Sequence, residues 1–307
     1  MSIIVITGGN GFIGKHLADH YLKNGDYVYS IDNYNTSVKP GDSYIKPGLT
    51  SVSFDLSTPP DDIIKHIIRS ADIVYHLASS VGVKYIDNSP RETIRNSMDI
   101  NNNMFPLFEE FQSRVVFASS SEVYGDTEYA SETDTLKIGS PDTLRWGYAC
   151  GKLMSEFLLK SYTFPSTIAR FFNVTGVGQL SSHGMVLPTF VELVNREENI
   201  VVYGDGMQYR SFCDIRDAVQ MLDIISGSDH VGEIYNIGNP DNTVTIKQLA
   251  EQVIMIINKD VQILYKPYDV AFSKDFGEIY KRRPNIDKIS KFYHPKFTIR
   301  DIIESMK

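Results

Sequence analysis

The sequence has little cysteine and no long hydrophobic run. Cys150 and Cys213 are the only two cysteines in 307 residues, which excludes a disulfide framework and favours a reducing compartment. No apolar stretch approaches the roughly 20 residues that span a bilayer. Ser2 leads into a short β-branched run ending in glycines rather than into a signal peptide. We therefore expect a cytoplasmic protein that does not contact membranes.

Positive charge is also scarce. The chain carries 30 Lys and Arg residues against 38 Asp and Glu residues, a net charge of -8, with both signs interspersed. Without a basic stripe there is no footprint for a phosphate backbone, so nucleic acid is excluded as a partner, and we predict no metal site. Apolar residues make up 42% and charged residues 22%, which is typical of a globular protein. The length of 307 residues suits one large domain or a domain with an appended lobe.

Short β-branched runs alternate with helical patterns through the first 173 residues. We expect strands at 3–7, 27–31, 52–54, 73–77, 114–118 and 167–171, and helices at 12–23, 61–69, 91–111 and 148–162. This alternation predicts an α/β Rossmann fold with a doubly wound parallel sheet over residues 1–173. Glycines shorten the elements beyond it, which predicts a smaller substrate-binding lobe over 174–307, with some segments crossing back to the sheet.

A glycine-rich loop follows the first expected strand and opens the first expected helix. Its spacing places Gly8, Gly11 and Gly14 every third residue. The first glycine permits a tight turn, the second lets the backbone approach a pyrophosphate, and the third allows close helix–strand packing. Phe12 and Ile13 begin the helix, whose free N–H groups and positive dipole end would face phosphates. The loop predicts a dinucleotide site.

An acidic residue, Asp32, ends the second expected strand, 18 residues after Gly14. A carboxylate there binds both ribose hydroxyls and repels a 2′-phosphate, so the sequence favours NAD over NADP. Its neighbour Asn33 is a further candidate cofactor contact. Asp55 and Leu56, after the third strand, are candidates to hold the adenine.

Tyr148 and Lys152 lie four residues apart on an expected helix, so their side chains share one face. A phenol needs its pKa to fall from about 10 before it can act as a base at neutral pH. A neighbouring ammonium and a positive nicotinamide ring would both favour the phenolate. The pair predicts a base that takes a proton from a sugar hydroxyl during oxidation.

The chain resembles the extended short-chain dehydrogenase/reductases, in the NAD-dependent nucleotide-sugar epimerase/dehydratase branch. The residues that carry the resemblance run nearly end to end: the glycine loop 8–14, Asp32, Asp55-Leu56, 76–79, Ser119-Ser-Ser-Glu-Val-Tyr-Gly125, Tyr148 with Lys152, Arg170-Phe-Phe-Asn-Val174, 203–206, 210–212 and Arg283-Pro284.

This resemblance implies a role for each motif. Ser120 would hydrogen-bond the sugar 4-hydroxyl, Tyr148 would be the base, and Lys152 would hold the nicotinamide ribose. Leu77, Ala78 and Ser79 would line the nicotinamide side of the site, and Ser119 would be a further cofactor contact. A nucleoside-diphosphate sugar carrying UDP, GDP or dTDP would be held by Val83, Lys84, Asn173, Val186, Leu187, Tyr203 and Arg210.

Oxidation at C4 of the sugar would be the first step, and the resemblance leaves the second step open. Ser121-Glu122 stands where a 4,6-dehydratase would carry Asp-Glu, which counts against dehydration. Ser121, Glu122 and Arg282 instead resemble the uronic acid decarboxylases, whose arginine lies near the sugar carboxylate. Val83 and Lys84 lie in a loop that resembles epimerases.

Decarboxylation of a nucleotide-linked uronic acid is therefore the favoured prediction. A 4-epimerase and a C4 dehydrogenase are alternatives, and a non-catalytic NAD-binding protein is the alternative from another class. The resemblance also implies a homodimer, in which the helices at 91–111 and 146–162 pair with their counterparts as a four-helix bundle.

Overall fold

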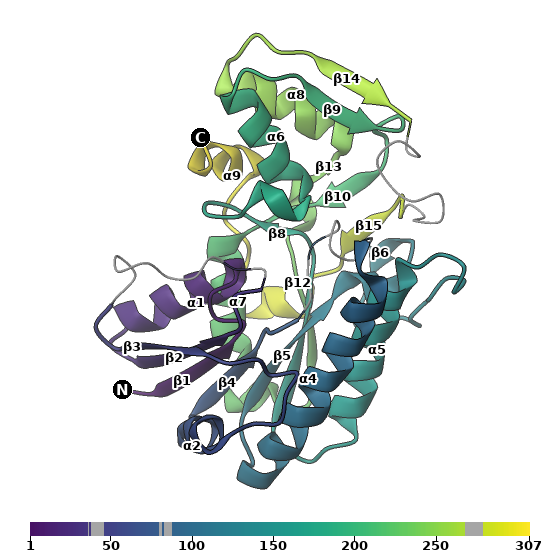
Figure 1. Cartoon of the computed structure of the whole chain (residues 1–307). Coiled ribbons are helices and arrows are strands. Elements are labelled where there is room, and N and C mark those ends of the chain that lie inside the picture. Colours follow the sequence, from purple (N-terminus) through teal and green to yellow (C-terminus); the bar gives the residue numbers. More distant parts are fainter. Residues whose placement is uncertain (36, 38–45, 80–81, 83–87, 268–278) are drawn as a thin grey trace.

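The computed structural model describes residues 1–35, 37, 46–79, 82, 88–267 and 279–307. A seven-stranded sheet forms its centre (Figure 1), and every pairing within this sheet is parallel. In spatial order its strands are β12 (Ile234–Ile237), β7 (Ser166–Phe171), β5 (Val115–Ser120), β4 (Ile73–His76), β1 (Ile3–Thr7), β2 (Tyr27–Asp32) and β3 (Leu49–Ser53).

Helices cover both faces of the sheet. One face packs against α1 (Phe12–Lys23) and α7 (Ile215–Ile225), and the other against α2 (Asp62–Ser70), α4 (Pro90–Phe111) and α5 (Trp146–Lys160). Since both faces are covered, the central strand β1 is apolar without alternation, as the sequence predicted. The predicted α/β Rossmann fold is confirmed.

Several boundaries differ from the sequence prediction, by about one to three residues, and two elements show the reason or the size of the shift. The third strand begins at Leu49 instead of residue 52 and pairs with β2 from Val28 to Asp32. Its residues Leu49-Thr-Ser-Val-Ser53 are only half buried at the sheet edge, so their mixed polarity conceals the strand in the sequence. Helix α5 begins at Trp146, two residues earlier than expected, and ends at Lys160.

Residues after 173 build a second hydrophobic core and also return to the sheet. Strand β12 joins the sheet edge, and α7 packs on α1. The second core is built from α6 (Val186–Asn195), α8 (Ile246–Ile257), α9 (Ile299–Ser305) and β9 (Ile200–Tyr203). The division into 1–173 and 174–307 stays a prediction.

Short strands complete the chain. They pair as β9 with β14 (Ile263–Lys266), β10 (Tyr209–Ser211) with β13 (Thr243–Thr245), β8 (Val174–Thr175) with β11 (Cys213–Asp214), and β6 (Thr127–Ala130) with β15 (Arg282–Pro284). Single 3₁₀ turns span Ser121–Tyr124, Ser181–His183, Ser228–His230, Pro240–Asn242 and Ile289–Lys291. The β6–β15 pair carries residues 282–284 back beside the sheet and places Arg282 within reach of the turn after β5.

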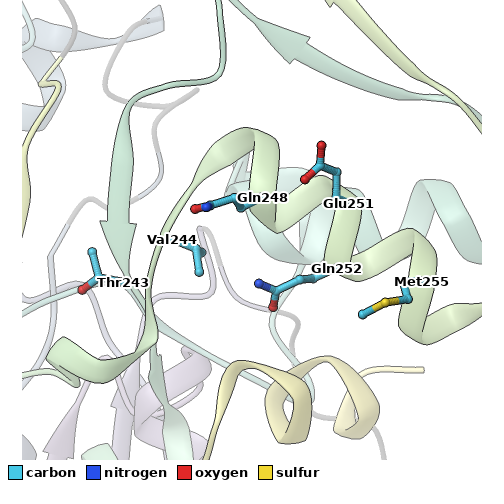
Figure 2. Close-up of a pocket in the computed structure, with 6 residues that line it drawn as sticks. All are labelled: Thr243, Val244, Gln248, Glu251, Gln252 and Met255. Carbon is cyan, nitrogen blue, oxygen red and sulfur yellow. The ribbon is translucent and has the colours of Figure 1, made fainter.

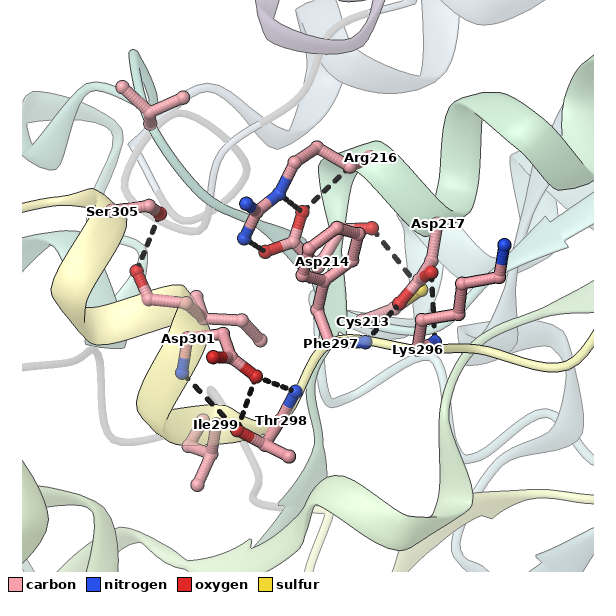
Figure 3. A network of polar contacts seen from close by, with 12 residues as sticks. Cys213, Asp214, Arg216, Asp217, Lys296, Phe297, Thr298, Ile299, Asp301 and Ser305 are labelled. Atoms are coloured by element: carbon pink, nitrogen blue, oxygen red, sulfur yellow. Dashed lines mark hydrogen bonds and ion pairs between the residues drawn. The ribbon is translucent and has the colours of Figure 1, made fainter.

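A buried carboxylate, Asp217, binds the segment 293–297 that leads from the sheet to α9 (Figure 3). Asp217 on α7 accepts hydrogen bonds from the Tyr293 hydroxyl at 2.8 Å and from the backbone N–H groups of Lys296 and Phe297 at 3.0 and 3.1 Å. The Arg216 guanidinium lies 3.6 Å from the centroid of the Phe297 ring. These contacts fix the C-terminal segment to α7.

No helix in the described ranges is both long and apolar enough to cross a membrane.

The packing of α7 predicts a stability effect. Leu222 is completely buried between α7 and the sheet, so Leu222→Ala should lower the free energy of unfolding by about 2–5 kcal/mol through lost burial and a cavity. Urea denaturation followed by circular dichroism measures this. The matched control is Met255→Ala on α8, whose side chain is 62% exposed and whose loss should change stability by less than about 0.5 kcal/mol. Equal effects of the two substitutions would contradict this packing.

Candidate active site

The loop after β1 is shaped by three glycines. Gly8 has a φ of +67°, and a Cβ there would lie 2.9 Å from the backbone nitrogen of Ala78. A Cβ on Gly11 would lie 3.1 Å from the Gly8 carbonyl oxygen, and one on Gly14 would lie 2.6 Å from it. Backbone packs directly on backbone in this loop, so side chains at these positions would open it.

Helix α1 starts immediately after this loop. Gly11 is its N-terminal cap and supplies no side-chain hydrogen bond to the first turn. The side chains of Phe12 and Ile13 pack partly against the core of the sheet. The first backbone N–H groups and the positive end of the helix dipole therefore remain for an anionic group such as a pyrophosphate.

The carboxylate of Asp32, at the end of β2, lies beside the same loop. One oxygen accepts the Asn10 backbone N–H at 3.0 Å, and the other accepts the Tyr34 N–H at 2.8 Å and the Ser37 hydroxyl at 2.9 Å. Each oxygen has two acceptor sites in principle, so Asp32 retains one site, on the oxygen that accepts from Asn10, for a ribose hydroxyl. The neighbouring Asn33 uses its side-chain oxygen to cap the turn two residues on.

Asp55 and Leu56 serve mainly local structure. The Asp55 carboxylate accepts the backbone N–H and the hydroxyl of Ser57 at 3.0 and 2.8 Å, while the Leu56 side chain is buried in the core under α2 and α4. Contact with an adenine would therefore use the remaining carboxylate oxygen of Asp55 and the backbone. Their role in cofactor binding stays a prediction.

The segment after β4 lines the opposite side of the glycine loop. The Leu77 N–H donates to the Thr7 carbonyl and the Ala78 N–H to the Thr7 hydroxyl, each at 3.2 Å. The Ser79 hydroxyl is buried with no hydrogen-bond partner among the described residues, and so is the Asn10 side-chain oxygen. Such unsatisfied groups normally have a partner, so a glycine cradle flanked by two of them fits a bound dinucleotide.

Tyr148 and Lys152 lie on α5 where it faces the end of β5. The Lys152 ammonium nitrogen donates to the Ala118 carbonyl at 2.8 Å, and Tyr148 interacts with the Ser120 hydroxyl. The Ser120 oxygen also accepts the Glu122 N–H at 3.2 Å. The structure thus brings the predicted serine, tyrosine and lysine together at the carboxyl end of the parallel sheet, where such folds bind ligands.

The titration of this pair differs from the sequence prediction. Burial and the negative charge of Glu122 raise the pKa of Tyr148, and they outweigh its contact with Ser120 and the charge of Arg282. Burial lowers the pKa of Lys152 to about 8, although the charge of Glu156 opposes the shift. The Lys152 ammonium donates its hydrogen bond to the Ala118 carbonyl and not to Tyr148, and the pKa of the Tyr148 phenol is set by its other neighbours.

Glu122 lies between two arginines. One of its oxygens accepts hydrogen bonds from Arg145 at 3.0 Å and from Arg282 at 3.1 Å. Burial alone would raise the pKa of Glu122, but the two guanidinium charges lower it to about 2. The other Glu122 oxygen and the Arg282 Nε are buried and have no hydrogen-bond partner among the described residues. The cluster of Glu122 and the two arginines therefore offers one hydrogen-bond acceptor and one donor to a ligand beside Tyr148.

The two serines next to Ser120 face the protein interior. The Ser119 hydroxyl donates to the buried carboxylate of Glu156 on α5. Ser121 is almost fully buried in the 3₁₀ turn after β5. Both positions support the segment that carries Ser120, and their predicted contacts with cofactor and substrate stay predictions.

Two of the predicted diphosphate contacts lie next to this cluster. Asn173 accepts a hydrogen bond from Arg282 at 3.3 Å and donates to the Ser211 carbonyl at 3.2 Å. The positive charges of Arg210 and Arg145 help burial to lower the pKa of Arg282 to about 10, against the charge of Glu122. Three arginines are therefore gathered at one place, which suits an anionic ligand.

The other predicted substrate residues are more scattered. Tyr203 ends β9, Val186 begins α6, and the Leu187 side chain is buried in the core of the second lobe. Val83 and Lys84 lie outside the described residues. A surface cavity of about 370 Å³ on β13 and α8 contains none of the candidate residues (Figure 2).

The sequence prediction missed Arg145 as a partner of Glu122. The 23 residues that separate Arg145 from Glu122 hide the contact from any local pattern. The available signal was the carboxylate of Glu122 beside the predicted catalytic Ser120, together with arginines at positions 145 and 282 that could pair with it.

Comparisons with known proteins agree with this geometry. The family model described as the NAD dependent epimerase/dehydratase family matches residues 4–238. The chain belongs to this family. The predictions of an NAD-dependent nucleotide-sugar-modifying enzyme and of NAD as its cofactor are thereby confirmed.

Relatives within this family include two decarboxylases. The UDP-N-acetyl-alpha-D-glucosaminuronate decarboxylase of Bacillus cytotoxicus is 30% identical over 95% of this chain and 92% of its own length. UDP-glucuronic acid decarboxylase 1 of Arabidopsis thaliana is 32% identical over 99% of this chain and 68% of its own length.

Two solved structures share the fold of this chain. The UDP-N-acetylglucosamine 4-epimerase of Methanobrevibacter ruminantium superposes with a TM-score of 0.84 at 26% identity, covering 99% of this chain and 97% of that one. Pal from Bacillus thuringiensis superposes with a TM-score of 0.85 at 24% identity, with the same two coverages.

The glycine loop predicts a binding defect. A Cβ at position 14 would lie 2.6 Å from the Gly8 carbonyl oxygen and 2.7 Å from Gly9 Cα, so Gly14→Ala must displace the loop. NAD affinity should fall by more than about tenfold, equivalent to about 1.4 kcal/mol, when measured by calorimetry. Gly227→Ala is the control, because its Cβ would make only ordinary contacts of 3.4 Å or more. Unchanged NAD affinity in Gly14→Ala would rule out this loop as the phosphate site.

Proposed function

We propose that the chain decarboxylates a UDP-linked uronic acid after oxidising the sugar at C4. The observation that carries the proposal is Arg282: its guanidinium is buried beside Glu122, and its Nε has no hydrogen-bond partner among the described residues. A planar guanidinium with an unused donor suits a carboxylate. The two decarboxylase relatives support the same substrate class.

The residues of the chain divide the chemistry between them. Bound NAD supplies a reversible two-electron oxidation of the C4 carbinol. Tyr148 would take the proton from the C4 hydroxyl, Ser120 would hydrogen-bond that oxygen, and Lys152 would orient the nicotinamide ribose. Burial and Glu122 raise the pKa of Tyr148 within the chain, so the positive nicotinamide ring of bound NAD would have to lower that pKa for the phenol to act as a base. Leu77, Ala78 and Ser79 would exclude water on the cofactor side.

Loss of carbon dioxide follows from the position of the ketone. A ketone at C4 is β to the C6 carboxylate, so the C5–C6 bond can break and its electron pair is taken up by the C4 carbonyl as an enolate. A proton from water at C5, and return to C4 of the hydride and the proton removed in the first step, would then complete a pentose. Arg282 and Arg145 would hold the carboxylate in register while that bond breaks.

The substrate nucleotide is proposed from the relatives, since both decarboxylases are named for UDP-linked sugars. Asn173 and Arg210 would meet the diphosphate, and Tyr203, Val186 and Leu187 the nucleoside end. A cytoplasmic location remains part of the proposal.

Product mass tests this function. The chain is incubated with NAD and either UDP-glucuronic acid or UDP-N-acetylglucosaminuronic acid, and we expect a product that has lost carbon dioxide. A product of unchanged mass would indicate epimerisation, a product that has lost water would indicate dehydration, and a product that has lost two hydrogens would indicate a dehydrogenase. Each of these outcomes would overturn the proposal.

Two variants localise the chemistry in that assay. Tyr148→Phe should lower kcat by about 10²–10⁴-fold without loss of NAD binding, because it removes only the proton acceptor. Arg282→Lys keeps the charge and loses the planar fork, so it should mainly weaken binding of the uronic acid. UDP-glucose lacks the carboxylate, so its binding affinity should differ little between the wild type and Arg282→Lys.

We also propose a homodimer through α4 and α5. These helices pack against each other and lie side by side on one face of the sheet in Figure 1. Phe157 is 70% exposed on α5, Met154 lies on the same helix face, and Ile94 is exposed on α4. Covering such apolar side chains favours association.

Light scattering should therefore give twice the mass of one chain, and Phe157→Glu should shift the protein towards the monomer by placing a charge in the interface. Met255→Glu on α8, where the side chain is 62% exposed, introduces the same charge away from α4 and α5 and serves as the control. A wild-type monomer would contradict the proposal.

A further inference from the structure

A buried ion pair lies one helical turn beyond Lys152. Glu156 on α5 receives two hydrogen bonds from Arg170 on β7, from Nε at 3.0 Å and from the terminal nitrogen at 2.7 Å. The side chains of Glu156 and Arg170 are 6% and 3% exposed. Two charges buried this deeply need good geometry to offset their desolvation, and the two-point pairing provides it.

The same carboxylate reaches the strand that carries the site. The Ser119 hydroxyl donates to Glu156. The preceding residue, Ala118, accepts the Lys152 ammonium through its carbonyl, and the following residue, Ser120, interacts with Tyr148. Glu156 therefore ties α5 to β5 between the two contacts that set the distance from Tyr148 and Lys152 to the strand.

Arg170 extends the connection to the sheet edge. Its second terminal nitrogen donates to the Tyr124 hydroxyl at 2.9 Å, and that hydroxyl donates to Asn236 on β12 at 2.7 Å. Asn236 in turn donates to the Ala130 carbonyl at 3.0 Å. The network holds Arg170 in a fixed position, so Glu156 has a stable partner.

The charge of Glu156 also acts on Lys152. Burial lowers the pKa of Lys152 to about 8, and Glu156 is the charged neighbour that opposes this. His76 on β4 faces the same ammonium. Burial, helped by the charge of Lys152, lowers the pKa of His76 to about 4, so its ring is neutral at pH 7. Arg170 on β7 lies beyond Glu156, and Tyr148 lies one turn earlier on α5.

We propose that Glu156 is a positioning residue of the active site, which holds Ser119, and through it Ser120, in place against α5 one helical turn from Lys152. Arg170 acts by holding the Glu156 carboxylate in place. The effect on Lys152 requires no ligand, whereas the effect on turnover rests on the proposed function.

Two substitutions separate charge from position. Glu156→Gln keeps an acceptor for Ser119 and removes the charge, so the pKa of Lys152 should fall. Because the ammonium is the form that orients the ribose, the high-pH limb of turnover should move to lower pH by the same amount. Glu156→Asp keeps the charge and shortens the side chain, so it should lower kcat and leave the pKa of Lys152 near its wild-type value.

The pKa of Lys152 is read by NMR from the side-chain carbon next to its amine in lysine-labelled protein, assigned with Lys152→Met. Asp217→Asn is the control for stability, because it removes a buried carboxylate with three hydrogen bonds on the other face of the sheet. It should lower the melting temperature without shifting Lys152.

The proposal would be overturned if the pKa of Lys152 were unchanged in Glu156→Gln, or if it shifted as much in Glu156→Asp as in Glu156→Gln. A merely structural role of Glu156 would not lower the Lys152 pKa in the Gln variant alone. If the pKa shifts as expected but no uronic acid is decarboxylated, the proposed function fails and the role of Glu156 in positioning stands.

Discussion

The site depends on one constraint: β1 and β4 are neighbours in a parallel sheet, and their carboxyl ends finish at the same level. Thr7 lies opposite His76 in the register, so the loops after these two strands meet face to face. Gly8 is what allows this, because a Cβ there would collide with the Ala78 backbone. The strand order also reverses at β1 and β4, and the crevice that results is where such sheets bind dinucleotides.

Buried charge provides the second level of order. The pairs of Glu122 with Arg145 and Arg282, and of Glu156 with Arg170, are all largely buried. Pairs of this kind add little net stability, but removing one partner leaves an uncompensated charge, which is costly. Each pair therefore fixes where its elements lie: the first joins the turn after β5 to α5 and β15, and the second joins α5 to β7.

Local patterns in the sequence predicted much of this structure. The β-branched runs, the glycine spacing and the four-residue spacing of Tyr148 and Lys152 each depend on neighbours along the chain, and the structure has those strands, that loop and that helix face. The contact of Arg282 with Glu122 spans 160 residues and depends on the β6–β15 pairing. The raised pKa of Tyr148 was likewise not predictable, since it reflects burial and a carboxylate brought close by folding.

The charge state of Glu122 bears on which reaction can follow oxidation. Arg145 and Arg282 lower the pKa of Glu122 to about 2, so this carboxyl is ionised near neutral pH and is a poor acid for the leaving hydroxyl that dehydration must protonate. Carbon dioxide leaves without a proton, so decarboxylation needs no acid at that step. An oxidising half built from Ser120, Tyr148 and Lys152 would serve either reaction equally well. The two arginines that keep Glu122 ionised thereby favour decarboxylation over dehydration, by charge pairing alone.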